Sequence, residues 1–447
     1  MQTTSSRTKM KTINGDSLTP ILIFRRLQGQ HKFLLESSAQ HEGAGRFSFI
    51  GANPRKTYKG IGDEIEELSY KTGQTYMHQG DLFVLLKRLM PRVSNTTQFP
   101  FSGGAVGYVS CKSVSSFTAK HEQLQLPDVH FHVYETIIVF DHMTDEVTLI
   151  YTNIDAEKKE PDLEKLAEQL INKREEEDTA CGNPLLKSTS TEQVVAALKN
   201  IKEVLDGENA RVVLSNQFLA KLDGDSFALY RNLRRKNPAP YMYYVTFDDH
   251  IVMGTSPESL VRVKGDRVIA TSIEGGYKRS LTNGEDVENE RKLAKNGQVK
   301  KSHMTLVKAV QHELQSVCIR DSIQMIDAMD IERSKRALYM TSQIEGTMYP
   351  MLHALDVLKA TLPVRASVNA SIEESAGVFN KAIGFIGFNG HLDFSLTGRS
   401  IVVANEMLHM QTTITATKYT DVDELIEQVT EGEQFFLQLL HEEGSGY

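Results

Sequence analysis

An arginine on a predicted strand is the side chain whose type and position first suggest chemistry. Residues 382–403 read AIGFIGFNGHLDFSLTGRSIVV, with strand-forming runs on both sides of Asn389-Gly390. That dipeptide suits a type I′ turn, in which both central residues need positive φ. After the turn, apolar and polar residues alternate and the polar series continues to Arg399, which predicts a hairpin with one apolar and one polar face. The polar face fits either a solvated surface or a cleft in which the planar guanidinium binds a carboxylate.

The elements around this hairpin predict a mixed fold with antiparallel sheets. Short apolar runs separated by polar and glycine-rich turns are typical of antiparallel strands. They lie at 21–24, 33–35, 47–50, 103–110, 136–155 and 211–215. Helical spacing of apolar residues occurs at 81–90, 161–173, 191–206, 226–236, 289–318 with a break near Gly297, 351–358 and 421–440. The acidic, polar stretch from 175 to 191 is the best linker, so we expect lobes at 1–178 and 179–447.

Composition excludes several classes of protein. The chain has 447 residues, a formal net charge of -8 and three widely spaced cysteines. A dedicated nucleic-acid binder would show a clustered basic excess, and the short run Arg231, Arg234, Arg235, Lys236 fits a solvated helix face. The cysteines form no zinc pattern and favour a reducing cytoplasm. The first residues lack the apolar core of a signal peptide, and we expect no membrane span.

Four sequence blocks carry a resemblance to a known family. They read LLESS (34–38), NPAPYMYY (237–244), TSPESLVRVKGDRV (255–268) and IGFIGFNGHLDFSLTGRS (383–400). Together they resemble component I of anthranilate synthase, a chorismate-utilising enzyme. The resemblance implies an α/β fold of the α+β type, with two large stacked antiparallel β-sheets, helices outside and a cleft for chorismate. It also implies a magnesium ion and a glutaminase subunit that supplies ammonia.

The magnesium ligands implied by the resemblance are replaced in this chain. The family provides a glutamate pair at i and i+3 on each of two helices. In register, these positions hold Val299 and Ser302 on one helix and Leu425 and Gln428 on the other. Magnesium requires oxygen ligands in octahedral geometry, so we expect no metal here and no cofactor. Val299 also fits the apolar stripe of its own helix.

Other positions that the resemblance assigns to catalysis have changed as well. The family's ring-contacting histidine falls on Tyr339, and the position that separates synthase types holds Glu274. A glutamine of the family falls on Arg211, and its glycine-rich loop falls on RASVNASI, which begins at Arg365. Glu274 would repel a chorismate dianion unless it were protonated. Two family residues are retained, the substrate-binding Arg399 and His303.

A second site implied by the resemblance is better preserved. The family binds tryptophan, its feedback inhibitor, between the LLES-like strand and the NPxPYM segment. Both segments are present here, and the expected site residues are Leu35, Glu36, Ser37, Asn237, Pro238, Tyr241 and Met242. An amino-acid site needs an acceptor for the ammonium group, donors for the carboxylate and an apolar slot. Alternatively, these segments only join the two lobes.

Three hypotheses about function follow. The first is a catalytically silent pseudoenzyme that responds to tryptophan or another amino acid. The second is a repurposed, metal-independent enzyme that acts on chorismate or another small carboxylate, with Glu274, Tyr339, Arg399 and Arg211 in the cleft. The third is a scaffold that binds a glutaminase subunit or a second copy of the chain.

Overall fold

A computed structural model describes most of the chain. The described residues are 8–37, 45–93, 97–110, 124, 126–155, 160–172, 185–188, 211–257, 259–280, 282–335, 337–362, 381–417 and 422–441. The expected helix at 191–206 and Arg365 lie outside these residues, and so does the predicted linker at 175–191 except for residues 185–188, which form a strand. For Arg211, Glu274, Leu425 and Gln428 the structure describes the backbone only.

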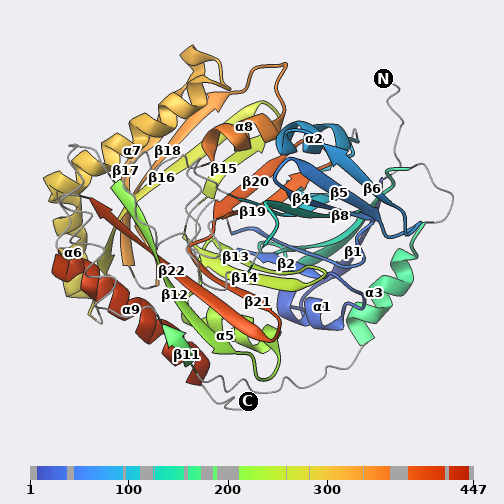
Figure 1. The fold of residues 1–447 in the computed structure, drawn as a ribbon, viewed down its shortest axis with the longest axis horizontal. Coiled ribbons are helices and arrows are strands. Elements are labelled where there is room, and N and C mark those ends of the chain that lie inside the picture. Colours follow the sequence, from blue (N-terminus) through green and yellow to red (C-terminus); the bar gives the residue numbers. More distant parts are fainter. Residues whose placement is uncertain are drawn as a thin grey trace.

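The first of two eleven-stranded antiparallel sheets, sheet A, begins with N-terminal strands and continues with C-terminal ones (Figure 1). The two groups meet where β2 pairs with β13. In spatial order its strands are β1 (Thr8–Asn14), β10 (Glu146–Thr152), β9 (Thr136–Asp141), β3 (Phe47–Gly51), β2 (Phe33–Glu36), β13 (Tyr241–Thr246), β14 (His250–Ser256), β21 (Arg399–Ala404), β22 (Met407–Thr417), β12 (Arg211–Lys221) and β11 (Leu185–Ser188).

The second sheet, sheet B, is built in the same way, and its two groups meet where β19 pairs with β7. Its strands are β17 (Gln324–Arg333), β18 (Ala337–Thr347), β16 (Arg267–Lys278), β15 (Ser259–Lys264), β20 (Leu392–Leu396), β19 (Lys381–Gly387), β7 (Gly104–Ser110), β8 (Val129–Tyr134), β4 (Lys56–Ile61), β5 (Glu64–Ser69) and β6 (Thr75–Gln79). Since both sheets join strands from either side of residue 178, the predicted lobes share their sheets and the boundary stays a prediction.

Helices cover the outer faces of the two sheets (Figure 1). Sheet A carries α1 (Pro20–Arg26), α3 (Leu163–Asn172), α5 (Ser226–Lys236) and α9 (Val422–His441), and sheet B carries α2 (Leu82–Leu89), α6 (Asn283–Lys295), α7 (Gly297–Gln315), the 3₁₀ turn Arg320–Ser322 and α8 (Ala354–Thr361). One apolar cluster lies under each helix layer, and a third, rich in phenylalanine and tyrosine, lies between the sheets. The expected pair of stacked antiparallel sheets with helices outside is confirmed.

Several local predictions are confirmed and others are wrong. Asp225 caps α5, and Asn296 ends α6 and caps α7, so the predicted break before Gly297 is correct. Residues 21–24 were expected as a strand but lie in α1, because the Thr19 side chain caps the helix and Pro20 occupies its first turn. The helix expected from residue 351 begins at residue 354, since His353 caps it.

The 382–403 hairpin also differs from the expectation. The last strand pair before the turn is Gly387 with His391, and Gly390 has a φ of 83°. The connection is therefore a three-residue loop with a left-handed glycine, not a two-residue type I′ turn. Past Thr397 the chain leaves sheet B, so Arg399 lies in sheet A and does not continue the polar face of β20. No helix in the described residues is long and apolar enough to cross a membrane.

Candidate functional site

The inward face of α7 carries the two residues that were expected at the first pair of magnesium-ligand positions. Val299 and Ser302 are partly buried, and His303 and Leu306 are buried beside them. These spacings of three and four residues put all four on one helix face, which packs on β16 and β18. An aliphatic group and a hydroxyl provide no carboxylate oxygen, so these two α7 residues do not fit Mg²⁺.

His303 is held from sheet B. Its Nε2 lies 2.8 Å from the hydroxyl oxygen of Ser342 on β18, and that oxygen also accepts a hydrogen bond from the Met329 N–H at 2.9 Å. Along β18 side chains alternate between faces, so Tyr339 lies on the face opposite Ser342. Glu274 is paired with Met340 on β18, and the structure describes only the backbone of Glu274.

Arg399 approaches the site from sheet A. Its Nη1 donates to the Asn237 side-chain oxygen at 3.2 Å, and its guanidinium lies 5.2 Å from the centre of the Phe435 ring on α9. Asn237 in turn donates to the Thr255 hydroxyl at 2.7 Å. Both contacts of Arg399 are to uncharged groups, so its positive charge is not neutralised by them. A residue expected in the amino-acid site, Asn237, thus positions the residue expected to bind a substrate carboxylate.

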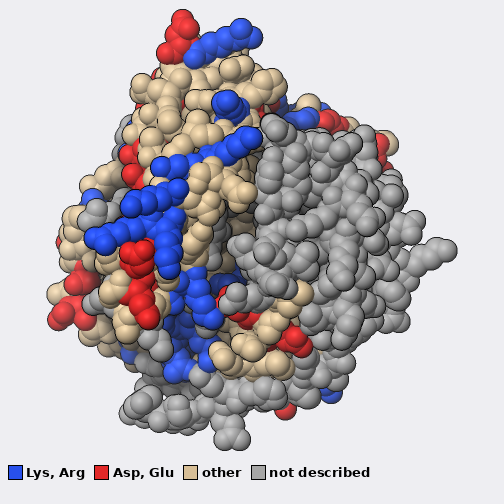
Figure 2. All heavy atoms as spheres, turned by 90° about the vertical axis from the view of Figure 1, so that its left-hand side faces the viewer, with Lys and Arg blue, Asp and Glu red and all other residues tan. Residues whose placement is uncertain are grey.

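Basic side chains also gather on the surface beside α6. A surface hollow beside α6 is lined by Tyr277, Glu288, Arg291, Lys292, Lys295 and Asn296. Figure 2 shows lysine and arginine side chains gathered on this side of the molecule. A positive surface of this kind raises the local concentration of anionic ligands.

The expected amino-acid site is centred on a buried carboxylate. Glu36 at the end of β2 is 4% exposed. Its Oε2 accepts hydrogen bonds from the Tyr230 hydroxyl at 2.8 Å and from Arg234 Nε at 2.9 Å, both on α5. Its Oε1 is buried and has no hydrogen-bond partner among the described residues. Burial raises the pKa of Glu36, and Arg234 and Tyr230 oppose that shift only in part.

The remaining residues of the expected amino-acid site lie on two faces of sheet A. Met242 is paired with Glu36 and lies on the α5 side, whereas Leu35 and Tyr241 lie toward sheet B. The Ser37 hydroxyl donates to the Pro240 carbonyl oxygen at 2.6 Å, which ties the end of β2 to the segment before β13. Pro238 is partly buried in the same segment. A ligand that contacts all of these residues would have to lie across the ends of β2 and β13.

Sequence reasoning missed two partners at this site. Arg234 was expected on a solvated helix face, but its half-exposed side chain reaches Glu36. Tyr230 and Arg234 lie one helical turn apart, and that spacing was the available signal. Asp393 on β20 was also missed: it accepts a hydrogen bond from the Tyr241 hydroxyl at 2.9 Å, with Arg262 Nε 3.7 Å from its other oxygen.

Comparisons with known proteins agree with this architecture. The chain is 28% identical over 435 residues to anthranilate synthase component 1 of Lactococcus lactis, which covers 90% of this chain and 93% of that protein. It is 29% identical to the same component of Neisseria meningitidis serogroup C, over 89% and 87% of the two chains.

Solved structures give the same result. The crystal structure of anthranilate synthase component I from Streptococcus pneumoniae matches with a TM-score of 0.72 at 26% identity, over 94% of this chain and 97% of that one. The menaquinone-specific isochorismate synthase of Escherichia coli shares the fold, with a TM-score of 0.69 at 11% identity, over 98% and 95% of the two chains. A sequence model described as chorismate binding enzyme matches residues 30–415. The chain therefore belongs to the chorismate-binding enzyme family.

Proposed function

We propose that this protein is an amino-acid-responsive member of the family that does not perform magnesium-dependent chorismate chemistry. The observation that supports the proposal is the inward face of α7, where the partly buried Val299 and Ser302 stand at the positions to which the resemblance assigns carboxylates. Mg²⁺ gives up its bound water molecules reluctantly, and negatively charged oxygen ligands compensate for that cost. Val299 and Ser302 provide no such oxygen.

The amino-acid site rests on the unpartnered oxygen of Glu36. A buried carboxylate oxygen without a donor is destabilising, and an ammonium group is a donor of matching charge. Arg234 already neutralises part of the carboxylate, so the pocket suits a zwitterion better than a simple cation. The resemblance names tryptophan as the first amino acid to test.

The experiment is calorimetric titration of the full chain with tryptophan, chorismate and MgCl₂ in separate runs, together with an ammonia-dependent anthranilate assay. We expect heat with tryptophan, no heat with Mg²⁺ and no anthranilate. Glu36→Gln removes one charge-assisted hydrogen bond of about 1.5–3 kcal/mol, so the affinity for tryptophan should fall by roughly 10- to 150-fold. Glu345→Gln, which changes an ion-paired glutamate on β18, is the matched control and should bind normally.

Two outcomes would contradict the proposal. Magnesium-dependent anthranilate formation would show that α7 does not exclude catalysis, and tryptophan binding unchanged by Glu36→Gln would remove Glu36 from the site. Heat with chorismate that is lost in Arg399→Gln would instead favour a metal-independent enzyme acting on a small carboxylate. That second candidate is supported by the uncharged partners of Arg399.

A further inference from the structure

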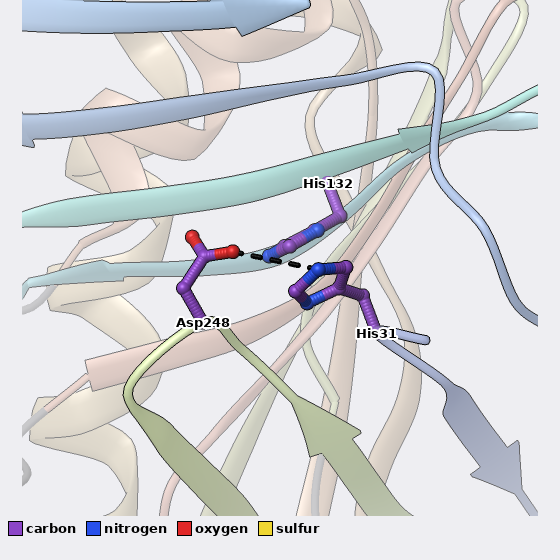
Figure 3. A group of neighbouring side chains, drawn as sticks. All are labelled: His31, His132 and Asp248. Atoms are coloured by element: carbon purple, nitrogen blue, oxygen red, sulfur yellow. Dashed lines mark ion pairs between the residues drawn. The ribbon is translucent and has the colours of Figure 1, made fainter. Parts of the chain in front are cut away.

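Two histidines and an aspartate from distant parts of the sequence meet near one end of the inter-sheet layer, away from both sites described above. His31 precedes β2 in sheet A, His132 lies on β8 in sheet B, and Asp248 lies in the turn between β13 and β14. Figure 3 shows the three side chains directed toward one another. One donor atom from each residue lies within 4.8 Å of the other two.

Their geometry is close to that of a metal site. His31 Nε2 lies 3.5 Å from Asp248 Oδ1. The imidazoles of His31 and His132 are stacked, with centroids 4.9 Å apart. In a tetrahedral site with metal–ligand bonds of about 2.0–2.1 Å, the donors lie roughly 3.3 Å apart. The aspartate–histidine distance is close to that value, whereas the two stacked imidazoles would have to turn relative to each other before both nitrogen lone pairs, which lie in the ring planes, could point at one ion.

His132 supplies an independent sign of a missing ligand. Its side chain is 0% exposed, and neither ring nitrogen has a hydrogen-bond partner among the described residues. Buried polar groups in native proteins are almost always paired, and a bound ion would provide a partner for one of the two ring nitrogens of His132.

Outer contacts hold the other two donors in place. The Tyr70 hydroxyl donates to Asp248 Oδ1 at 2.8 Å, and His130 Nε2 lies 3.7 Å from Oδ2. His31 has a φ of 50°, and its carbonyl oxygen accepts a hydrogen bond from the Tyr134 hydroxyl at 2.6 Å. Hydrogen bonds from a second layer of residues are what orient the ligands of a metal centre.

We propose that His31, His132 and Asp248 bind one divalent transition-metal ion of the Zn²⁺ class. Two imidazoles and one carboxylate suit Zn²⁺, whereas Mg²⁺ and Ca²⁺ require oxygen donors. The Asp248 side chain is 37% exposed and that of His31 is 16% exposed, so the fourth position opens to solvent and takes a water molecule. Because His132 belongs to sheet B and the other two ligands to sheet A, the ion cross-links the sheets and stabilises the folded chain.

The test is titration of the chelator-treated full chain with Zn²⁺ by calorimetry. We expect one Zn²⁺ per chain, a higher melting temperature with Zn²⁺ and no response to Mg²⁺. Co²⁺ in place of Zn²⁺ should give visible absorption bands of a four-coordinate ion. His31→Ala and Asp248→Asn change partly exposed side chains, and each should weaken Zn²⁺ binding by more than about a hundredfold, the upper range for loss of an outer-layer partner.

The matched control is His312→Ala, which removes an exposed histidine near the end of α7 and should leave Zn²⁺ affinity unchanged. Circular dichroism of each variant checks that it folds. The proposal is overturned if the wild-type chain gives neither Zn²⁺ heat nor Co²⁺ bands. It is equally overturned if correctly folded His31→Ala and Asp248→Asn proteins bind Zn²⁺ as tightly as the wild type.

Discussion

Two tyrosines of β13, Tyr241 and Tyr243, should differ in how much their hydroxyl groups stabilise the folded chain. Tyr241 and Tyr243 both face sheet B, and each hydroxyl has a named partner. Tyr241 donates to the carboxylate of Asp393, on β20 of the other sheet, at 2.9 Å. The hydroxyl of Tyr243 lies 2.7 Å from that of Ser400, a neutral group in the same sheet.

The magnitude follows from the charge of the acceptor. A hydrogen bond to a charged group contributes about 1.5–3 kcal/mol, whereas one between neutral groups contributes about 0.5–1.5 kcal/mol. Burial raises the pKa of Asp393, so the ionised carboxylate depends on its donors. Tyr241→Phe leaves it with Arg262 alone at 3.7 Å. We therefore expect Tyr241→Phe to lower the free energy of unfolding by about 1 kcal/mol more than Tyr243→Phe does.

Chemical denaturation followed by circular dichroism at pH 7 measures the difference. Tyr76→Phe, at a hydroxyl on a half-exposed side chain, is the control and should change stability little. Because the folded pKa of Asp393 is raised, lowering the pH through that value toward 3.8 protonates the carboxyl in the folded chain first and makes the bond neutral. The difference between the free energies of unfolding of Tyr241→Phe and Tyr243→Phe should then become smaller. A Tyr243→Phe cost equal to or above that of Tyr241→Phe at pH 7 would refute the reasoning.

Two further predictions concern single buried groups. Burial lowers the pKa of His353 to about 4, while its Nδ1 accepts the Leu355 N–H that caps α8. As the pH falls from 6.5 to 4, the unfolded chain binds this proton before the folded chain does, so the free energy of unfolding should fall in that window. In His353→Asn, which keeps a hydrogen-bond acceptor at the cap, the denaturation midpoint should fall less over the same pH range than in the wild type. Burial also raises the pKa of the Cys318 thiol to about 11, which leaves roughly one thiolate in a thousand at pH 8. Peptide-resolved alkylation should modify Cys318 only after denaturation, and equal rates in native and denatured protein would contradict this.

Local signals in the sequence were reliable where the residues that define an element lie within that element or next to it. Asn296-Gly297 and the apolar spacing of α5 and α7 lie within, or next to, the helices that they define. The errors at residues 21–24 and 351–353 have the same origin, since Thr19 and His353 are capping side chains whose role was overlooked. The 382–403 stretch failed for a different reason, because nothing in its alternation marks the point where the chain passes from sheet B to sheet A.

The sequence by itself indicated the family and, through that resemblance, the two stacked antiparallel sheets; that Val299 and Ser302 replace the family's carboxylates stays a prediction. Only the tertiary structure decided which side chains meet. Glu36 and Arg234 lie 198 residues apart, and Tyr241 lies 152 residues from Asp393. Spacing along a helix or strand reports only on neighbours within a turn or a pleat, whereas these contacts depend on strand order and on how two sheets stack. The proposed metal site of His31, His132 and Asp248 was invisible in the sequence for the same reason.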